Sequence, residues 1–213
     1  IQNLFLKKIN SYYKNSFEKK LHPRLESENL IKKLFKIENI PNNTLISQKK
    51  YEEKNYVLIS IACSGDSKQW GYKNHFQIIQ LLIKKNFSNF YILAGKRQSE
   101  MEKRLILDFN KDNVILEGTS HLELKDIFEI IHKAKFYFGH DTGFMHIATS
   151  FEIPALVIFG DLPPFNYNKF INSIEPDDGI YSENSIEAIS FDKVKNEIEK
   201  FIDKYEFLKK SQK

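Results

Sequence analysis

The amino-acid sequence predicts an α/β protein with a doubly wound parallel sheet, and two observations support this. Short, continuously apolar and β-branched runs, typical of buried strands, alternate with segments whose apolar residues recur at helical spacing. Loops rich in Gly, Asn, Asp and Ser separate the two kinds of segment. A chain that alternates strands and helices in this way builds a parallel sheet with right-handed crossovers.

Five strands are expected, each followed by a helix that packs on the sheet. The strand-like runs are "YVLISIAC", "NFYILAG", "NVILEG", "KFYFG" and "PALVIFG", at residues 56–63, 89–95, 113–118, 135–139 and 154–160. The helix-like segments are residues 75–85, 99–109, 120–134, 142–151 and part of 185–210. Ser99 is the candidate N-cap of the second helix, and Ser120 with Glu123 has the spacing of a capping box before the third.

Composition limits the kind of protein and its surroundings. The single Cys63 excludes a disulfide framework and a cysteine-based zinc site, so a reducing cytoplasm is expected. No apolar run approaches the roughly 20 residues of a membrane-spanning helix. The start, "IQNLFLKKINSYYKN", becomes polar too quickly for a signal peptide. The net charge of +4 suits an anionic ligand or an anionic membrane face without establishing either.

Two regions are expected to meet near residue 50. Residues 1–50 are basic, and "HPRLESENLIKKLFKIENI" (22–40) has helical apolar spacing, so this region is predicted to be a helical linker or extension. Residues 51–213 hold all the alternating segments and end in a long helix. Because the chain opens on Ile rather than Met, we expect it to be a fragment or a processed form of a longer protein.

Polar residues that directly follow the strands are the candidates for a site, because ligands of doubly wound sheets bind beyond the carboxyl ends of the strands. All these loops are expected to open on one rim of the sheet. Their small residues, hydroxyls and lysine favour a phosphate-bearing ligand. The residues are Cys63 to Lys68, Gly95 to Arg97 with Glu100, Gly118 to Ser120, His140 to Gly143, and Gly160 with Asp161.

The sequence "HDTG" stands where a strand passes into a helix. The first N–H groups of a helix lack internal partners and attract anions, so Thr142 and Gly143 predict a phosphate cradle, with Lys68 as the compensating cation. Asp141 is alternatively a simple N-cap, and the cap and the cradle are compatible. His146, four residues after Thr142, is either a hydrogen-bonded core residue or part of the site.

Other ligand classes fit the sequence less well. His140, Asp141 and His146 are not expected to converge on a metal. A G-x-G-x-x-G fingerprint and a Walker A sequence are both missing, which argues against a typical NAD enzyme or P-loop NTPase. The basic termini lack the interleaved aromatics of nucleic-acid binders. Trp70 is interpreted as a loop anchor, and "KRQSEMEKR" as a solvated helix face from which Glu100 could reach ribose hydroxyls.

Several segments resemble one known family. "KFYFGHDTGFMHIATSFEIPALVIFG" resembles the D-T-G-x-x-H-x-A signature, with its later P and F-G, of glycosyltransferase family 9, the heptosyltransferase family. "SGDSKQW" is similar to the Lys-x-Trp loop of that family. Further similar segments are "ILAGKRQSE", "LEGTSHLELKDIFEIIHKA", "NSIEAISFDKVKNEIEKFI" and "HPRLESENLIKKLFKI", so the resemblance covers about residues 20–205.

The resemblance implies that residues 51–213 are the Rossmann-like, nucleotide-sugar-binding C-terminal domain of a GT-B glycosyltransferase. The general base would then lie on an N-terminal acceptor domain outside this chain. The implied reaction is an inverting, metal-independent transfer from an ADP-heptose-like donor, without a further cofactor, to the lipopolysaccharide core or a related surface glycan. The implied location is the cytoplasm, with peripheral contact to the inner membrane. Partners would be the donor, a glycan or glycolipid acceptor and the N-terminal domain or a partner chain, but no nucleic acid.

Matching positions carry the family's site residues onto this chain. Lys68 and Asp141 would be the residues of the catalytic step, with Lys68 on the donor diphosphate and Asp141 either approaching the sugar or ordering the loop. Cys63 and Gly65 stand where relatives have Thr and Arg, and "FGDLPP" replaces "FGPT-x-P", which leaves the donor open. The remaining donor contacts would be Ser64, Thr142 and Gly143 on the diphosphate, Glu100 on the ribose, Leu122 near the base, and His146 bracing the D-T-G turn.

Two other functions remain open at this point. The chain as it stands could be a nucleotide-sugar-binding module that needs a partner for transfer. It could also be a GT-B-like epimerase of the nucleotide sugar, for which Asp141 and the histidines would be the acid–base candidates.

Overall fold

The computed structural model describes residues 23–36, 38, 56–65, 68–110, 114–164, 168–182 and 185–205. The chain forms two compact units, Ile1–Asn43 and Thr44–Lys213. In the first unit, helix α2 (Pro23–Phe35) lies within the helical segment expected at 22–40 and carries two lysines in its last turn. The predicted boundary near residue 50 lies outside the described residues.

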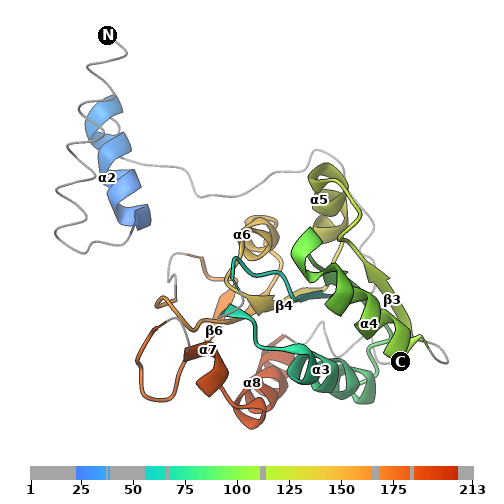
Figure 1. Cartoon of the computed structure of the whole chain (residues 1–213). Coiled ribbons are helices and arrows are strands. Elements are labelled where there is room, and N and C mark those ends of the chain that lie inside the picture. Colours follow the sequence, from blue (N-terminus) through green and yellow to red (C-terminus); the bar gives the residue numbers. More distant parts are fainter. Residues whose placement is uncertain are drawn as a thin grey trace. The chain divides into compact units, whose positions relative to one another are not determined.

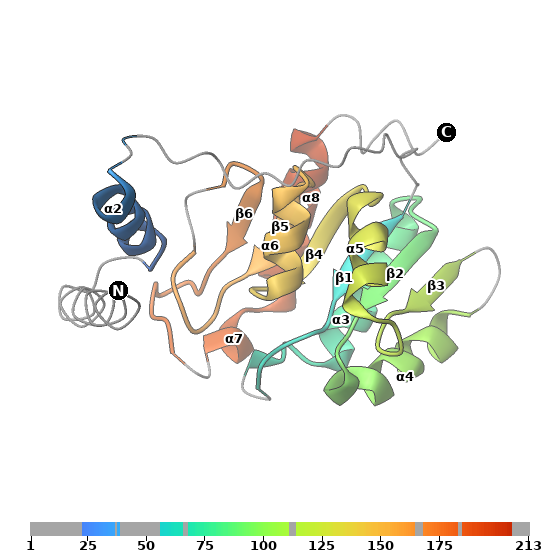
Figure 2. The same cartoon turned by 90° about the horizontal axis from the view of Figure 1, so that it is seen from above.

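The second unit contains a parallel sheet of six strands in the described residues, and helices cover both of its faces (Figures 1 and 2). The strand order is β3-β2-β1-β4-β5-β6, and every neighbouring pair is parallel. The chain runs outward from β1 to β3 and then returns to place β4 beside β1. This reversal between β1 and β4 is the switch point at which doubly wound sheets bind ligands. The strands are β1 (Val57–Ser60), β2 (Asn89–Leu93), β3 (Ile115–Gly118), β4 (Phe136–His140), β5 (Ala155–Ile158) and β6 (Ile171–Ile174).

Two apolar cores lie on the two faces of the sheet, because successive side chains of a strand point to opposite sides. In β1, Val57 and Ile59 belong to one core and Leu58 to the other. Helices α3 (Tyr72–Lys84), α4 (Ser99–Phe109) and α8 (Phe191–Lys204) supply the first core. Helices α5 (Leu124–His132) and α6 (Gly143–Ser150) supply the second (Figure 1). The central strands β1, β4 and β5 are therefore fully buried.

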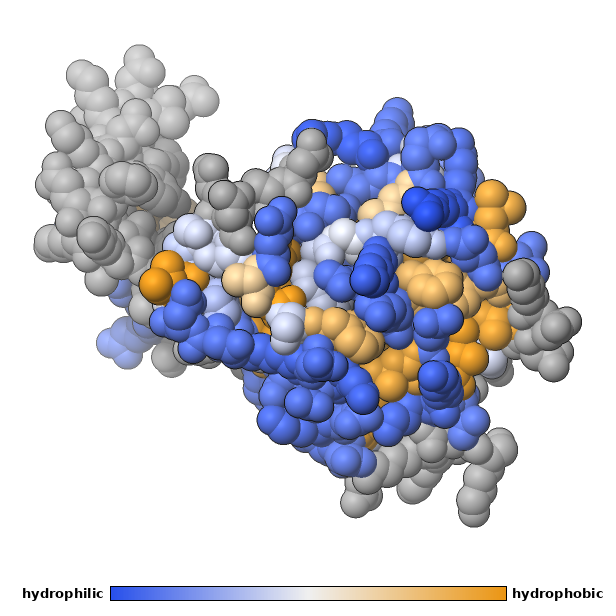
Figure 3. All heavy atoms as spheres, turned by 60° about the horizontal axis from the view of Figure 1, so that its bottom comes forward, coloured by the Kyte–Doolittle hydropathy of each residue, from blue (hydrophilic) through white to orange (hydrophobic). Residues whose placement is uncertain are grey.

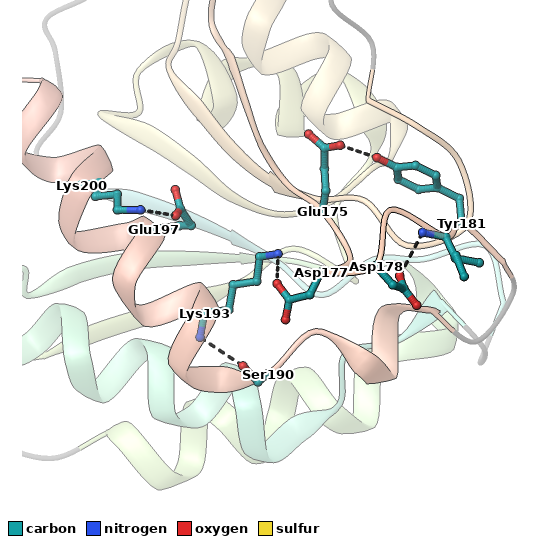
Figure 4. Close-up of polar contacts among 9 residues, drawn as sticks. Glu175, Asp177, Asp178, Tyr181, Ser190, Lys193, Glu197 and Lys200 are labelled. Atoms are coloured by element: carbon teal, nitrogen blue, oxygen red, sulfur yellow. Dashed lines mark hydrogen bonds and ion pairs between the residues drawn. The ribbon is translucent and has the colours of Figure 1, made fainter.

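Strand β6 is the one strand of the described sheet that was not predicted from the sequence. Its sequence, "INSI", places two polar residues in the middle, and three of its four residues are only partly buried. As an edge strand it lacks the continuous apolar run that marked the other five. The segment after β6 is held by side-chain contacts, which Figure 4 shows: Tyr181 bonds to Glu175, and Lys193 of α8 pairs with Asp177.

Helix starts also differ from prediction at two places. Helix α4 begins at Ser99, but its N-cap is Gln98. The expected capping box of Ser120 and Glu123 does not form in the described loop: Glu123 is the N-cap of α5, while Ser120 hydrogen-bonds to Glu102 of α4. The tail contains a short helix α7 (Ser185–Ala188) before α8.

Hydrophilic side chains cover most of the face seen in Figure 3, with apolar patches between them. In the ranges that the structure describes, no helix combines the length and the apolar character that a membrane crossing requires.

Candidate functional site

A pocket of about 530 Å³ lies at the carboxyl ends of the strands around the switch point. Its volume falls in the range of small-molecule sites. The segments that follow β1, β2 and β4, including the first turns of α6, form it together with the start of α5. Its wall is mainly apolar, with hydroxyls and charges at a few positions. The lining residues are Ala62, Cys63 and Ser64 after β1; Gly95, Lys96, Arg97 and Gln98 after β2; Leu124; and Asp141, Thr142, Gly143, Phe144 and Ile147 after β4.

The amino end of α6 forms one wall of this pocket. The N-cap is Thr142, so the prediction of Asp141 as the cap is wrong by one residue. The Thr142 hydroxyl lies 3.3 Å from the Tyr137 hydroxyl, and Tyr137 donates to the carbonyl of His140. A Cβ atom built on Gly143 would meet nothing within 4 Å. The backbone here is therefore open to close approach, and the first amides of α6 offer the donors and the positive dipole end that attract an anion.

A charged cluster adjoins this wall. Lys68 forms an ion pair with Asp161, the residue that follows β5, and both side chains are partly exposed. Asp141 Oδ1 lies 3.6 Å from His146 Nε2. Burial raises the pKa of Asp141; His146 and Lys68 oppose this rise, and Asp161 adds to it. Burial also lowers the pKa of His146, against the influence of Asp141. Lys68 is therefore paired with one carboxylate, Asp161, and influences a second, Asp141, electrostatically.

The structure brings most of the predicted residues together. Ser64, Asp141, Thr142 and Gly143 line the pocket, while Lys68 and His146 adjoin it through Asp141. Glu100 and Leu122, the other two predicted site residues, are not among the described residues that line the pocket. The Glu100 side chain is 87% exposed and bonds to Lys103, and Leu122 packs against the core under α5 and α6.

The 3₁₀ helix η2 (Lys96–Gln98) forms another wall of the pocket. Lys96 and Arg97 were expected at this rim, although the surrounding charge run was interpreted as a solvated helix face, whereas Gln98 was not predicted as a site residue. Arg97 Nη1 donates to the Ser64 carbonyl at 3.2 Å, and Gln98 Nε2 donates to the Cys63 carbonyl at 3.3 Å. For Gln98, the position in the turn that follows β2 was the available signal. Leu124, Phe144 and Ile147 of the apolar wall gave no such signal.

The metal alternative depended partly on His140. Its Nε2 lies 3.2 Å from the amide nitrogen of Trp70, and its Nδ1 lies 3.2 Å from the carbonyl oxygen of Ala62, so both ring nitrogens are engaged. Among the described side chains, no group of three or more His, Cys, Asp or Glu is arranged to hold a metal ion.

A doubly wound parallel sheet with a pocket at its switch point defines a domain of the Rossmann-like α/β class. More specifically, the chain belongs to glycosyltransferase family 9 (heptosyltransferase), because the family model matches residues 6–199. No curated protein matches the chain.

Solved structures share the fold. Escherichia coli heptosyltransferase WaaC with ADP is 21% identical with a TM-score of 0.57, over 70% of this chain and 45% of that chain. WaaC with ADP-2-deoxy-2-fluoro heptose is 22% identical with a TM-score of 0.58, and the match covers 76% of this chain and 45% of that chain. E. coli ADP-heptose LPS heptosyltransferase II is 16% identical with a TM-score of 0.60, and the match covers 72% of this chain and 48% of that chain. The predicted Rossmann-like sheet of a GT-B glycosyltransferase is confirmed, and the chain spans less than half the length of these relatives.

Proposed function

We propose that this chain is the donor-binding part of a glycosyltransferase that uses a nucleotide-diphosphate sugar. The observation that carries the proposal is the open amino end of α6, which lies in a pocket at the switch point of the sheet. A diphosphate is the natural occupant of such a helix start. The pocket volume and its apolar wall suit the nucleoside part of the same ligand.

In the proposed reaction, an acceptor hydroxyl attacks the anomeric carbon with inversion, and the bond to the diphosphate breaks. Negative charge grows on the leaving diphosphate, where the amides that follow Thr142 stabilise it. Lys68 supplies positive charge after it exchanges its contact with Asp161 for the phosphate. No metal is required for this charge balance. Asp141 is assigned to the sugar side, because it lines the pocket next to the helix start.

The general base is assigned to a domain or partner chain beyond this one, since the chain spans less than half the length of its solved relatives. An ADP-heptose-like donor is proposed because WaaC was solved with ADP and with ADP-2-deoxy-2-fluoro heptose. The acceptor is proposed to be the lipopolysaccharide core or a related surface glycan. The protein would then work in the cytoplasm, in peripheral contact with the inner membrane.

Because the chain spans less than half the length of its solved relatives, a second candidate function is a module that binds the nucleotide sugar but transfers nothing alone. One set of assays separates the candidates. Calorimetric titration with ADP, UDP, GDP and their sugars reports which nucleotide binds, and a product assay with and without acceptor reports transfer or sugar isomerisation. Binding of a nucleotide diphosphate supports the site, and transfer separates the enzyme from the module. If none of the three nucleotides binds at millimolar concentration, the proposed function is wrong.

A further inference from the structure

The loop between β1 and α3 carries Ser64 and Lys68, and its far end is fixed at Trp70. The Trp70 side chain is 3% exposed, and its Nε1 donates to the carbonyl of Ile189 at 2.9 Å. Its carbonyl accepts from Asn74 Nδ2 at 2.7 Å. Its backbone N–H donates to Nε2 of His140 at 3.2 Å. The expected role of Trp70 as a loop anchor is confirmed, and one of its three polar contacts comes from the strand that ends at the proposed diphosphate site.

His140 contacts both ends of this loop. It is the last residue of β4, is 2% exposed and directly precedes Asp141. Because its Nε2 accepts the Trp70 N–H, its proton lies on Nδ1, which donates to the carbonyl of Ala62 at 3.2 Å. Ala62 stands at the start of the loop and Trp70 at its end. One imidazole therefore joins the loop that carries Lys68 to the turn that carries Asp141, Thr142 and Gly143.

The surroundings keep this imidazole neutral. Burial lowers the pKa of His140 to about 3, with a further lowering by His75 and an opposing influence of the Ala62 carbonyl. His75 is the titratable group that faces it, with ring centroids 5.2 Å apart, and burial lowers the pKa of His75 to about 4. A neutral ring keeps the Nε2 lone pair that accepts the Trp70 N–H.

We propose that His140 is a positioning residue that holds the Lys68 loop against the start of α6. This inference rests on the proposed function, which takes the two segments as parts of one nucleotide site. His140 is not among the described residues that line the pocket. It acts through the Trp70 amide and the Ala62 carbonyl, so its loss would release the loop without removing any group that binds phosphate.

Two substitutions test this role. His140→Phe fills the site without either hydrogen bond, whereas the Gln of His140→Gln has an oxygen to accept the Trp70 N–H and an amide to reach Ala62. Thr149→Val is the matched control, because it removes another buried polar group, bonded to Met145 and His146 within α6. The measurements are hydrogen exchange of the Trp70 amide and calorimetric affinity for ADP, on the full chain.

We expect His140→Phe to speed exchange of the Trp70 amide at least about tenfold and to weaken ADP binding by about tenfold or more, since small misplacements of a binding group are costly. His140→Gln should restore most of the slow exchange of the Trp70 amide and most of the ADP affinity. Thr149→Val should leave the exchange rate and the affinity unchanged. A folded His140→Phe protein with unchanged exchange and unchanged ADP affinity would overturn the inference.

Wild-type protein provides a test that needs no variant. In a ¹⁵N spectrum of the imidazole, Nδ1 of His140 should carry the proton and Nε2 should not. A proton on Nε2 would contradict the inference even if His140→Phe failed to fold. If wild-type chain binds no nucleotide, the proposed function fails, whereas the Trp70 exchange and the His140 tautomer still decide whether His140 holds the loop.

Discussion

The buried carboxylate of Glu102 allows a quantitative prediction about the loop between β3 and α5. Glu102 is 3% exposed. Its Oε1 accepts the amides of Thr119 at 2.6 Å and Ser120 at 2.9 Å, and its Oε2 accepts the Ser120 hydroxyl. The packing is tight, because a Cβ atom on Gly118 would lie 2.5 Å from Glu102 Cδ. Glu102→Ala removes all three bonds and takes the acceptor from the Ser120 amide, while the Thr119 amide keeps its bond to the carbonyl of Ile92 at 3.2 Å.

The expected loss follows from these contacts. A hydrogen bond to a charged group contributes about 1.5–3 kcal/mol, and bonds that share one acceptor are not additive. We therefore expect Glu102→Ala to lower the free energy of unfolding by about 3–5 kcal/mol. For a domain of this size, that corresponds to a fall in Tm of roughly 10 °C. Urea unfolding followed by fluorescence and circular dichroism measures the change.

Glu100→Ala is the matched control for this experiment. It changes the same residue type two positions earlier on the same helix, where the side chain is 87% exposed and bonds only to Lys103 in the described structure. Its effect should stay within about 0.5 kcal/mol. Equal and small effects of the two substitutions would refute the claim that Glu102 organises the loop.

Two further predictions concern charge near the site. Asp161→Asn should strengthen ADP binding about threefold, because it frees Lys68 and removes a carboxylate near the proposed phosphate position. Lys68→Ala should weaken ADP binding about tenfold. If calorimetry gave both variants the ADP affinity of the wild type, both expectations would be contradicted. The free energy of unfolding should fall as the pH drops below about 6.5, because His75 and His140 have lowered pKa values of about 4 and about 3 in the folded protein and take up protons more readily when unfolded. Each ring contributes a slope of up to about 1.4 kcal/mol per pH unit near pH 5, and a flat profile in urea unfolding between pH 7 and pH 5 would rule this out.

The sheet was predictable from the sequence wherever a strand is buried on both faces. Strands β1, β4 and β5 are fully buried and mainly apolar, the pattern that parallel packing requires. Strands β2 and β3 were predicted as well, although some of their residues are partly buried or exposed. Strand β6 was not predictable, because its outer position lets Asn172 and Ser173 remain partly exposed. Hydrogen-bonded pairing with β5, and not an apolar run in its own sequence, makes this segment a strand.

The candidate site was predictable as far as topology determines it. Residues that directly follow a strand reach the rim, which correctly brought Ser64 and Thr142 to the pocket. Glu100 was placed there by the same reasoning, but it falls in the first turn of α4 and is exposed to solvent. Gln98, in the preceding 3₁₀ turn, lines the pocket instead. The switch from 3₁₀ to α-helix decides which side chain reaches the site, and the sequence carries little signal for it.

The central claim is that the start of α6 binds a nucleotide diphosphate, and one substitution tests it directly. Gly143→Asp places a carboxylate at the helix start, where the structure has space for a side chain. Gly179→Asp adds the same charge in a turn after β6, where a side chain also meets nothing within 4 Å and where the φ of +66° is one that Asp adopts more readily than most residues. In calorimetric titrations with ADP, we predict that wild type and Gly179→Asp bind one ADP with equal affinity and that Gly143→Asp binds at least about tenfold more weakly. Equal affinity in all three proteins would contradict the account.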